Sequence, residues 1–433
     1  MNSETVKKKI LIRIGSLRHG GAEKVLVTFL KNLPSDKYEI DLLLNLYSGK
    51  YLADVPAWVK VFHLNKGEMI TTNRLQDLPK KALRVIYQKT LTAFPFLLYQ
   101  FILKGKKYDV EFAAIHGFRD EILNSPQKSS KKMIWIHNDL RKTEFHNYND
   151  DEIRKFFGFD KILVISEHIQ KDFENLAKNE DEKKRIVRIY NPLDTEEILS
   201  KSKEQNKENR EEKTLSDHPK RLNDDFKSLS NEPNRMNGEG KRLNNEPRTL
   251  NQQQCTISRE PLFVSVGTVF PQKGFDRLLR THQKLLEEGF KHHILIIGDG
   301  YDFENVKNLR DDLGVSTTVT MLGFCGNPYP YIKKADFYIL SSRYEGFPTV
   351  LFEALTLKKN IIATDVSGVR EMLEDGELGL IVENSEEGIY EGMKKALQKT
   401  VDFNRYQENL LDYKMPFNLE NSVQTLIKII DDL

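Results

Sequence analysis

The residues Lys9–Gly15, KILIRIG, form a short run of apolar and β-branched side chains that ends in glycine. Such a run is typical of a strand buried on both faces of a parallel sheet. The turn Ser16–Gly21 follows it, and Ala22–Leu33 then carries apolar residues at helical spacing. This order of strand, turn and helix predicts that the chain opens with an α/β unit.

The same alternation continues through residues 1–195. Helical patterns lie between several further strand-like segments, which are Tyr38–Leu46, Val59–Leu64, Val110–Ala114, Lys132–His137, Lys161–Ser166 and Arg185–Tyr190. We therefore expect residues 1–195 to form a Rossmann-like domain, with helices around a doubly wound parallel sheet.

The composition changes sharply after this region. Residues 201–250 hold only seven apolar residues among fifty, and the phrases KRLN and NEP each occur twice. So little apolar surface cannot offset the entropy of ordering a chain, about 1 kcal/mol or more per residue. We therefore expect residues 196–259 to form a low-complexity, disordered linker.

A second Rossmann-like domain is predicted over residues 260–410. Its strand-like segments are Leu262–Gly267, His293–Gly298, Thr318–Leu322, Phe337–Leu340, Asn360–Thr364 and Gly379–Val382, and its clearest helical patterns are Phe275–Glu288, Phe303–Leu313 and Thr349–Lys358. Residues 411–433 are expected to hold a last helix that packs back toward the first domain. The fold class is thus α/β, with two parallel-sheet domains facing across a cleft, where ligands usually bind.

Charge and cysteine content exclude several classes of protein. Lys and Arg number 66 against 64 Asp and Glu, so binding of nucleic acid through bulk positive charge is excluded. The two cysteines, Cys255 and Cys325, cannot form a disulfide framework and fit a reducing compartment. The chain shows no apolar run long enough to span a membrane and no signal peptide. We expect a cytoplasmic protein that can touch the inner face of the membrane.

Two glutamates, Glu345 and Glu353, bracket the residues Gly-Phe-Pro-Thr-Val-Leu-Phe. Pro348 suits the first position of a helix, which places Glu345 in the preceding loop and Glu353 about one turn inside. Such carboxylates can bond sugar hydroxyls, although for two glutamates alone a helix-start acid and a solvated acid are the more common explanation. A helix start also offers free N–H groups to an anion, here those of Phe347, Thr349 and Val350.

Further candidates follow other predicted strands. Gly20 and Gly21 open a helix, where glycines let N–H groups approach a phosphate or simply satisfy the turn. Lys273 lies in a strand-to-helix loop, where an ammonium suits a diphosphate, although most lysines are solvated. Gly298 ends a strand and can offer backbone contact. His137 also ends a strand, at the edge where open α/β sheets bind ligands, and a structural histidine is an equal alternative.

Metal and hydrolase motifs do not occur in the sequence. There is no pair of cysteines at metal-binding spacing and no H-E-x-x-H, so no metal site is expected. No G-x-S-x-G occurs, so an α/β-hydrolase is unsupported. His116 is a weaker second candidate among the scattered histidines.

Taken together, the motifs resemble glycosyltransferase family 4, whose members are retaining enzymes of the GT-B fold that use nucleotide sugars. The resemblance covers nearly everything except the low-complexity segment. The motifs that carry it are GGAEKV (Gly20–Val25), WIHND (Trp135–Asp139), YNPLD (Tyr190–Asp194), VGTVFPQKGFDRLL (Val266–Leu279), IIGDG (Ile296–Gly300), LGF (Leu322–Phe324), SSRYEGFPTVLFEAL (Ser341–Leu355) and TDVSGVREML (Thr364–Leu373).

The resemblance implies a role for each acidic and basic candidate. Glu353 would bind the ribose hydroxyls of the nucleotide, and Glu345 would hold the donor sugar. Lys273 and the backbone amides of Thr349 and Val350 would neutralise the diphosphate leaving group. With these groups in place, no metal and no other cofactor is expected.

The resemblance also implies contacts from glycine turns and one histidine. Gly20 and Gly21 would lie against the diphosphate and sugar, the backbone of Gly323 and Phe324 would meet the base, and His137 would contact the sugar near the reacting carbon. The remaining donor-binding residues that the resemblance implies are Thr268, Gly298, Phe347 and Pro348.

One position departs from the family pattern. The family often places Arg directly after the glycine of the strand-end turn, and here that position is Thr268. One positive charge on the diphosphate is then missing, and Arg343 is a candidate substitute.

The implied reaction moves a hexose-type sugar from a nucleotide-diphosphate sugar, most simply a UDP-sugar, to a saccharide or lipid-linked saccharide. Cell-surface polysaccharide synthesis is the implied setting. Two alternatives stay open: a GT-B-fold sugar-nucleotide epimerase, and a catalytically silent GT-B subunit that supports a partner.

The acceptor side offers one further pattern. Asp77–Lys107 combines seven basic residues with apolar ones at helical spacing. A basic amphipathic helix can lie on an anionic membrane surface. An ordinary helix pair packed on the sheet is the favoured alternative.

Overall fold

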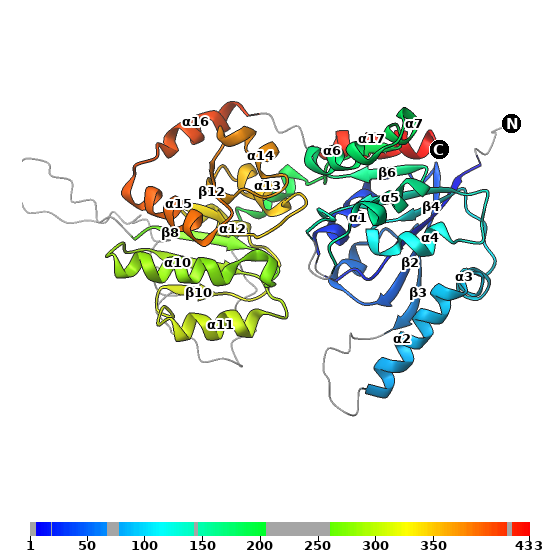
Figure 1. Cartoon of the computed structure of the whole chain (residues 1–433), viewed down its shortest axis with the longest axis horizontal. Coiled ribbons are helices and arrows are strands. Elements are labelled where there is room, and N and C mark those ends of the chain that lie inside the picture. The colour runs from blue at the N-terminus through cyan, green and yellow to red at the C-terminus, as the bar shows by residue number, and fades with distance from the viewer. Residues whose placement is uncertain (1–5, 19, 67–77, 143–145, 205–259, 414–417) are drawn as a thin grey trace, which may run out of the picture. The chain divides into compact units, whose positions relative to one another are not determined.

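The structure, a computed structural model, describes residues 6–18, 20–66, 78–142, 146–204, 260–413 and 418–433. Met1–Lys203 and Pro261–Leu433 form one compact unit. Figure 1 shows two separate sheets, one in the blue to green part of the chain and one in the green to orange part. The greater part of the expected linker, residues 205–259, lies outside the described residues.

The first sheet has seven parallel strands in the order β3-β2-β1-β4-β5-β6-β7. The strands are β1 (Lys8–Ile14), β2 (Tyr38–Tyr47), β3 (Lys60–Lys66), β4 (Val110–Ala113), β5 (Lys131–Ile136), β6 (Lys161–Val164) and β7 (Ile186–Arg188). The longer helices are α1 (Gly21–Asn32), α2 (Leu78–Ala93), α6 (Glu167–Leu176) and α8 (Thr195–Lys201), and the short ones are α3 (Pro95–Leu97), α4 (Arg119–Leu123), α5 (Asp150–Arg154) and α7 (Glu180–Lys183). Every segment expected as a strand here is a strand.

The second sheet has six parallel strands in the order β10-β9-β8-β11-β12-β13. They are β8 (Leu262–Val266), β9 (His293–Ile297), β10 (Val319–Met321), β11 (Phe337–Leu340), β12 (Asn360–Thr364) and β13 (Leu380–Val382). The helices are α10 (Phe275–Glu287), α11 (Phe303–Asp312), α12 (Tyr329–Lys334), α13 (Thr349–Thr356), α14 (Val369–Met372), α15 (Glu386–Gln398), α16 (Phe403–Asp412) and α17 (Leu419–Asp431).

Buried apolar residues form continuous cores on these sheets. The β-branched and leucine side chains of β1, β2 and β5 are almost wholly buried, as expected of strands covered on both faces. On α17, Val423, Leu426 and Ile430 are buried, and the Ile430 carbonyl accepts a hydrogen bond from Lys8 Nζ at 2.7 Å. The Tyr38 hydroxyl donates to Asp431 at 2.7 Å. The last helix therefore contacts strands β1 and β2.

Helix α8 lies inside the range expected as linker, so ordered structure extends past residue 195. The Asp194 side chain accepts from Glu197 N at 3.0 Å and caps the helix start, while Ile198 is buried. The Asp194 cap and the buried Ile198 stabilise this short helix. The sequence does not predict it because the average composition of the following residues is strongly polar.

No helix in the described part of the chain has the length and apolar character needed to cross a bilayer.

Candidate functional site

Lys273 and Glu345 meet where the second sheet reverses its strand order. β8 and β11 are neighbours in the sheet, and the loops after their carboxyl ends carry Lys273 and Glu345. Lys273 Nζ lies 2.7 Å from Glu345 Oε1, and Ser342 Oγ donates to the same oxygen at 2.7 Å. Glu345 is buried. Ligands of open α/β sheets bind outside the carboxyl ends at such a point, so both residues lie where a ligand is expected.

Helix α13 begins beside this pair. Pro348 is its N-cap residue, in extended conformation, and Thr349 is its first residue. The expectation that Pro348 occupies the first helical position is wrong by one residue, because Pro348 has φ −72° but ψ 96°. The first N–H groups of a helix have no acceptor within the helix, so the start of α13 can bind an anion.

Glu353 is held by a lysine from the first domain. It lies one turn inside α13 and is buried, and its Oε1 accepts from Lys24 Nζ at 2.9 Å and from the Tyr329 hydroxyl at 3.2 Å. Burial alone would lower the pKa of Lys24, but Glu353 and Tyr329 outweigh burial and raise it, so the ammonium stays charged. Burial and Glu353 together raise the pKa of Tyr329, so its hydroxyl remains a donor.

Removing Lys24 should destabilise the protein. Lys24→Met leaves the buried Glu353 carboxylate with Tyr329 alone, and we expect the free energy of unfolding to fall by about 2 kcal/mol. Urea unfolding of Lys24→Met, Glu353→Gln and the double variant measures the coupling. In a protein that already carries Glu353→Gln, Lys24→Met should lower the free energy of unfolding by less than half of its effect in the unaltered protein. Equal costs in both backgrounds would show that the pair contributes nothing.

The glycines that open α1 face the start of α13. A Cβ placed on Gly21 would lie 3.6 Å from Thr349 Oγ1, so the two helix starts approach closely. Gly20 is the N-cap of α1, and the Glu23 carboxylate folds back over it, where a Cβ on Gly20 would clash at 2.0 Å. Burial raises the pKa of Glu23. A carboxylate thus lies at the helix start that was expected to receive a phosphate.

Glycine turns lie side by side at the ends of β8, β9 and β10. Gly298 has φ 148°, its N–H donates to the Gly323 carbonyl at 2.8 Å, and a Cβ on it would lie 1.8 Å from the Gly267 carbonyl oxygen. Thr268 follows in the same turn, where its carbonyl accepts from Phe270 N at 2.8 Å. The close packing of these backbones explains why glycine is needed at Gly298.

Two aromatic candidates have different surroundings. The ring of Phe324 is about half exposed, and Lys50 Nζ lies 4.0 Å from its centroid. Phe347 is buried, and its ring centroid lies 5.4 Å from that of Tyr190. Phe347 can therefore serve a ligand only through its backbone, whereas Phe324 has a ring face to offer.

His137 follows β5 and adjoins the loop of Glu345. Its Nε2 lies 3.0 Å from the Ala114 carbonyl oxygen, and a Cβ on Gly346 would lie 2.1 Å from the His137 carbonyl oxygen. Burial lowers the pKa of His137 to about 3, so the ring is neutral and Nε2 carries the proton. The buried Nδ1 has no hydrogen-bond partner among the described residues and is an acceptor.

Acidification should destabilise the protein through three histidines. Burial lowers the pKa of both His137 and His282 to about 3, while unfolded histidine titrates near 6.5. Between those values the unfolded chain binds more protons, so the free energy of unfolding falls by up to about 1.4 kcal/mol per pH unit for each group. Burial lowers the pKa of His116 as well, so denaturant unfolding from pH 7 to 5 should show a fall with contributions from all three groups, and His137→Gln should make that fall smaller. A slope unchanged in that variant would contradict the lowered pKa of His137.

Arg343 does not act as the substitute for the missing arginine. Both of its terminal nitrogens bind Asp276, at 2.8 and 2.7 Å, and Nη1 also donates to the Pro271 carbonyl. A guanidinium held by two parallel hydrogen bonds to one carboxylate is not directed at a diphosphate. The charge missing at Thr268 is therefore not supplied by Arg343 in this structure.

One side-chain group has the spacing of metal ligands. Oxygen or nitrogen atoms of Asp139, His168 and Asp172 lie within 4.8 Å of one another. The guanidinium of Arg141 already binds Asp172 at 2.8 Å, and Arg141 N donates to Asp139. An arginine therefore neutralises part of this cluster.

Lys24 and Tyr329 are the residues that motif reasoning missed. Lys24 belongs to the motif GGAEKV, one turn into α1, and its position beside a helix start that was expected to receive a phosphate was the signal available. Tyr329 has no comparable signal, because only the fold brings α12 to α13. His116 lies outside the group of contacts around Glu345 and Glu353 and packs its ring against Tyr148 at 5.8 Å.

Comparisons with solved structures identify the fold. The structure superposes on Anabaena HepE, solved in complex with UDP and glucose, with a TM-score of 0.64 at 16% identity. The superposition covers 98% of this chain and 100% of HepE. The fold is GT-B. The GT-B likeness extends to WaaG, a glycosyltransferase involved in lipopolysaccharide biosynthesis, with a TM-score of 0.58 at 15% identity over 96% of this chain and 99% of the other.

A family model matches the second domain of the chain. Residues 248–410 match the family model described as Glycosyl transferases group 1. A Campylobacter jejuni N-acetylgalactosamine-N,N'-diacetylbacillosaminyl-diphospho-undecaprenol 4-alpha-N-acetylgalactosaminyltransferase is 33% identical over 141 residues, which are 32% of this chain and 38% of that protein. The matched part thus spans about two fifths of that relative's length.

Proposed function

We propose that this protein is a retaining glycosyltransferase of the family 4 type that transfers a hexose-type sugar from a UDP-sugar to a saccharide or lipid-linked saccharide. The observation that carries the proposal is the Lys273–Glu345 pair, 2.7 Å apart beside the start of α13, with the buried Glu353 one turn further on. The bound UDP of HepE and the diphospho-undecaprenol in the name of the Campylobacter relative support the choice of donor and acceptor.

In the proposed reaction the bond between the anomeric carbon and the diphosphate breaks, while the acceptor oxygen bonds that carbon on the same face. The acceptor proton passes to the departing phosphate oxygen, so the products are the glycoside and a nucleoside diphosphate. Negative charge builds on the diphosphate, where Lys273 and the N–H groups of Thr349 and Val350 stabilise it. These groups supply the positive charge that a metal provides elsewhere.

The carboxylates and the histidine orient the donor in this proposal. Glu353 accepts from the ribose hydroxyls after Lys24 has released it, and Glu345 accepts from hydroxyls of the sugar. His137 Nδ1 accepts from a sugar hydroxyl, which satisfies the buried acceptor atom that has no partner among the described residues. We propose that the reaction takes place on the cytoplasmic side of the membrane.

A thermal-shift screen against UDP-, GDP- and ADP-sugars tests the proposal. A ligand at a hundred times its dissociation constant stabilises the folded state by about 2.7 kcal/mol, so the correct donor should raise the melting temperature clearly. We expect a UDP-sugar to give the largest shift, and Glu353→Gln to reduce it. If no nucleotide sugar stabilises the protein at millimolar concentration, the proposal fails.

Product analysis separates transfer from the two alternatives. Incubation of the selected donor alone would yield an epimer if the protein were an epimerase. A silent subunit would bind the donor without releasing any UDP. Slow release of UDP without an epimer supports a transferase.

A further inference from the structure

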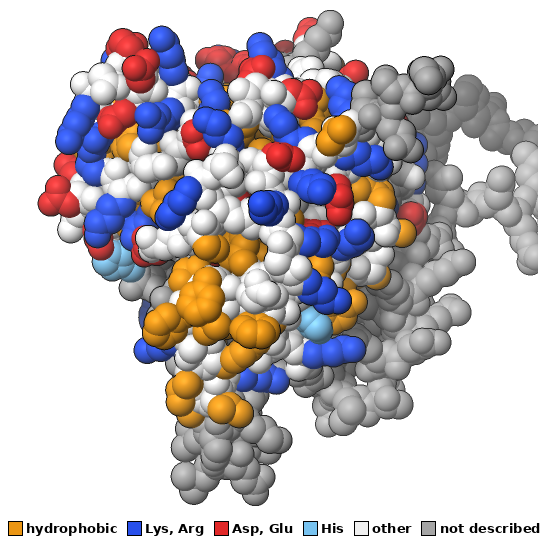
Figure 2. Space-filling model, turned by 90° about the vertical axis from the view of Figure 1, so that its right-hand side faces the viewer, with side chains coloured by type: hydrophobic (Ala, Val, Ile, Leu, Met, Phe, Trp, Pro, Cys, Tyr) orange, Lys and Arg blue, Asp and Glu red, His pale blue; other side chains and the backbone are white. Residues whose placement is uncertain are grey.

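An apolar stripe faces solvent along α2 and continues through α3 into η2 (Leu98–Ile102). On α2, Leu83 is 69% and Ile86 is 60% exposed, and their spacing of three residues puts them on one face. Phe96 and Phe101 follow, 57% and 71% exposed. Figure 2 shows apolar side chains gathered on one face and bordered by Lys and Arg. Contiguous exposed apolar surface of this kind marks an interaction site.

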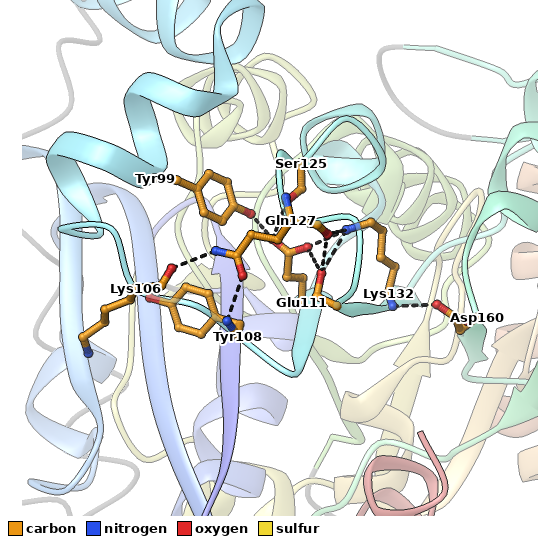
Figure 3. A network of polar contacts seen from close by, with 9 residues as sticks. Tyr99, Lys106, Tyr108, Glu111, Ser125, Gln127, Lys132 and Asp160 are labelled. Carbon is orange, nitrogen blue, oxygen red and sulfur yellow. Dashed lines mark hydrogen bonds and ion pairs between the residues drawn. The ribbon is translucent and has the colours of Figure 1, made fainter.

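The inner side of the same segment is fixed to the first sheet. Leu98 and Leu103 are buried in a small core, and the Tyr99 hydroxyl donates to the buried Glu111 of β4 (Figure 3). Tyr99 is buried and Phe101 is exposed, as expected of residues two positions apart on a helical turn, and Leu103 N donates to Leu98 O at 3.1 Å in the same turn. The core under this segment is filled by other side chains, so the exposed phenylalanines are not needed to complete it.

The anchor under this segment is a satisfied polar network. Glu111 also accepts from Lys132 Nζ at 2.5 Å, from Ser125 Oγ at 2.7 Å and from Ser130 Oγ. Burial and Glu111 raise the pKa of Tyr99, which keeps its hydroxyl a donor. A buried carboxylate with four donors gives the segment a defined position, so the outer face is presented on a rigid support.

The charge around the stripe has one sign. Between Leu78 and Tyr108 the sequence contains seven Lys and Arg and no Asp or Glu. Lys89, Lys104 and Lys107 are exposed, and none of them forms an ion pair within the described part of the chain. Aromatic and apolar side chains among unpaired lysines match a surface with an apolar interior and anionic head groups.

We propose that this basic–apolar surface, made of Leu83, Ile86, Phe96 and Phe101 with Lys89, Lys104 and Lys107, docks on an anionic phospholipid bilayer. The inference deepens the proposed function and rests on it, because a lipid-linked acceptor lies in such a bilayer. A second copy of this chain is a poorer occupant, because a symmetric contact would oppose two clusters of the same positive charge. This inference goes beyond the alternative favoured by the sequence, a helix pair packed on the sheet, because the outer face of the segment is exposed.

Co-sedimentation of the full-length protein with vesicles tests the proposal without any sugar. Phosphatidylcholine vesicles with and without phosphatidylglycerol are compared at low and high salt. Phe96→Ser/Phe101→Ser should lower the partition coefficient at least tenfold, and changing Lys89, Lys104 and Lys107 to Ser should lower it roughly a hundredfold at low salt. Leu411→Ser, at a residue of α16 that is 68% exposed, is the matched control and should leave binding unchanged.

The outcomes separate this inference from the proposed function. Absence of binding to anionic vesicles at low salt would overturn it, as would binding that neither set of variants reduces. Self-association that the phenylalanine variant abolishes, without vesicle binding, would assign the surface to a second copy and also overturn it. Thermal shift with the UDP-sugar is measured on the same variants. Lost vesicle binding with an intact donor shift supports docking, whereas a missing donor shift in the unaltered protein with intact vesicle binding refutes only the proposed function.

Discussion

Lys273→Met should lower the rate of UDP release from the selected UDP-sugar by at least about a hundredfold. The methionine keeps most of the aliphatic stem but removes the ammonium that faces the expected diphosphate. Loss of one preorganised donor from a developing anion typically costs a hundredfold to a thousandfold in turnover. Because the charge develops in the transition state, kcat should fall much more than the dissociation constant of the donor rises.

The matched control for Lys273→Met is Arg343→Ala. Arg343 is a cation of the same loop region, but its guanidinium is held by Asp276. We expect turnover within threefold of the unaltered protein. If Lys273→Met retained full turnover, Lys273 would have no part in the mechanism, and the pair with Glu345 would be structural.

Glu353→Gln should raise the dissociation constant of the donor about tenfold or more. A carboxylate accepting from two ribose hydroxyls forms charge-assisted hydrogen bonds, each worth about 1.5–3 kcal/mol, and the amide loses that charge. Glu353→Gln also weakens the contact with Lys24 in the free protein. A nucleotide then displaces Lys24 more easily, which offsets part of the lost donor affinity. Isothermal titration with UDP and with the UDP-sugar measures the effect.

A matched acidic control is available in the same domain. Glu304, an exposed glutamate of α11, should tolerate the change to glutamine without any effect on donor affinity. If Glu353→Gln left the dissociation constant unaltered, the ribose contact would be discarded. UDP alone should lose as much affinity as the UDP-sugar, because the proposed contact is with the nucleotide.

Local patterns predicted the strands of both sheets because the central strands are continuous apolar runs covered on both faces, while edge strands such as β3 and β13 still carry short apolar runs. The positions of Glu345 and Lys273 could also be predicted, since both follow strand ends that meet at one edge. The partners of Glu353 could not be predicted, because Lys24 lies 329 residues away and reaches it only through tertiary contact. For Arg343 the sequence shows the positive charge but not its ion pair with Asp276, so the suggestion that Arg343 replaces the missing arginine was wrong.

The partial exposure of the α2–η2 segment was also beyond sequence reasoning. A helical pattern of apolar and basic residues fits both a helix pair packed on the sheet, which the sequence favoured, and a membrane-facing helix. The structure adds the contact of the Tyr99 hydroxyl with Glu111, which anchors the inner side of the segment and leaves Phe101 exposed. Glu111 belongs to β4, so this contact depends on the tertiary structure and has no local sequence signal.

In the proposed reaction, the contact between Lys24 and Glu353 has a consequence for product release. UDP and a fresh UDP-sugar would both compete with the Lys24 ammonium for the Glu353 carboxylate, and the tether of the chain keeps the local concentration of that competitor constant. The affinity for both nucleotides would fall by the same factor, so the selectivity between them would not change. The return of the ammonium to Glu353 would speed the release of UDP, which favours turnover where UDP accumulates.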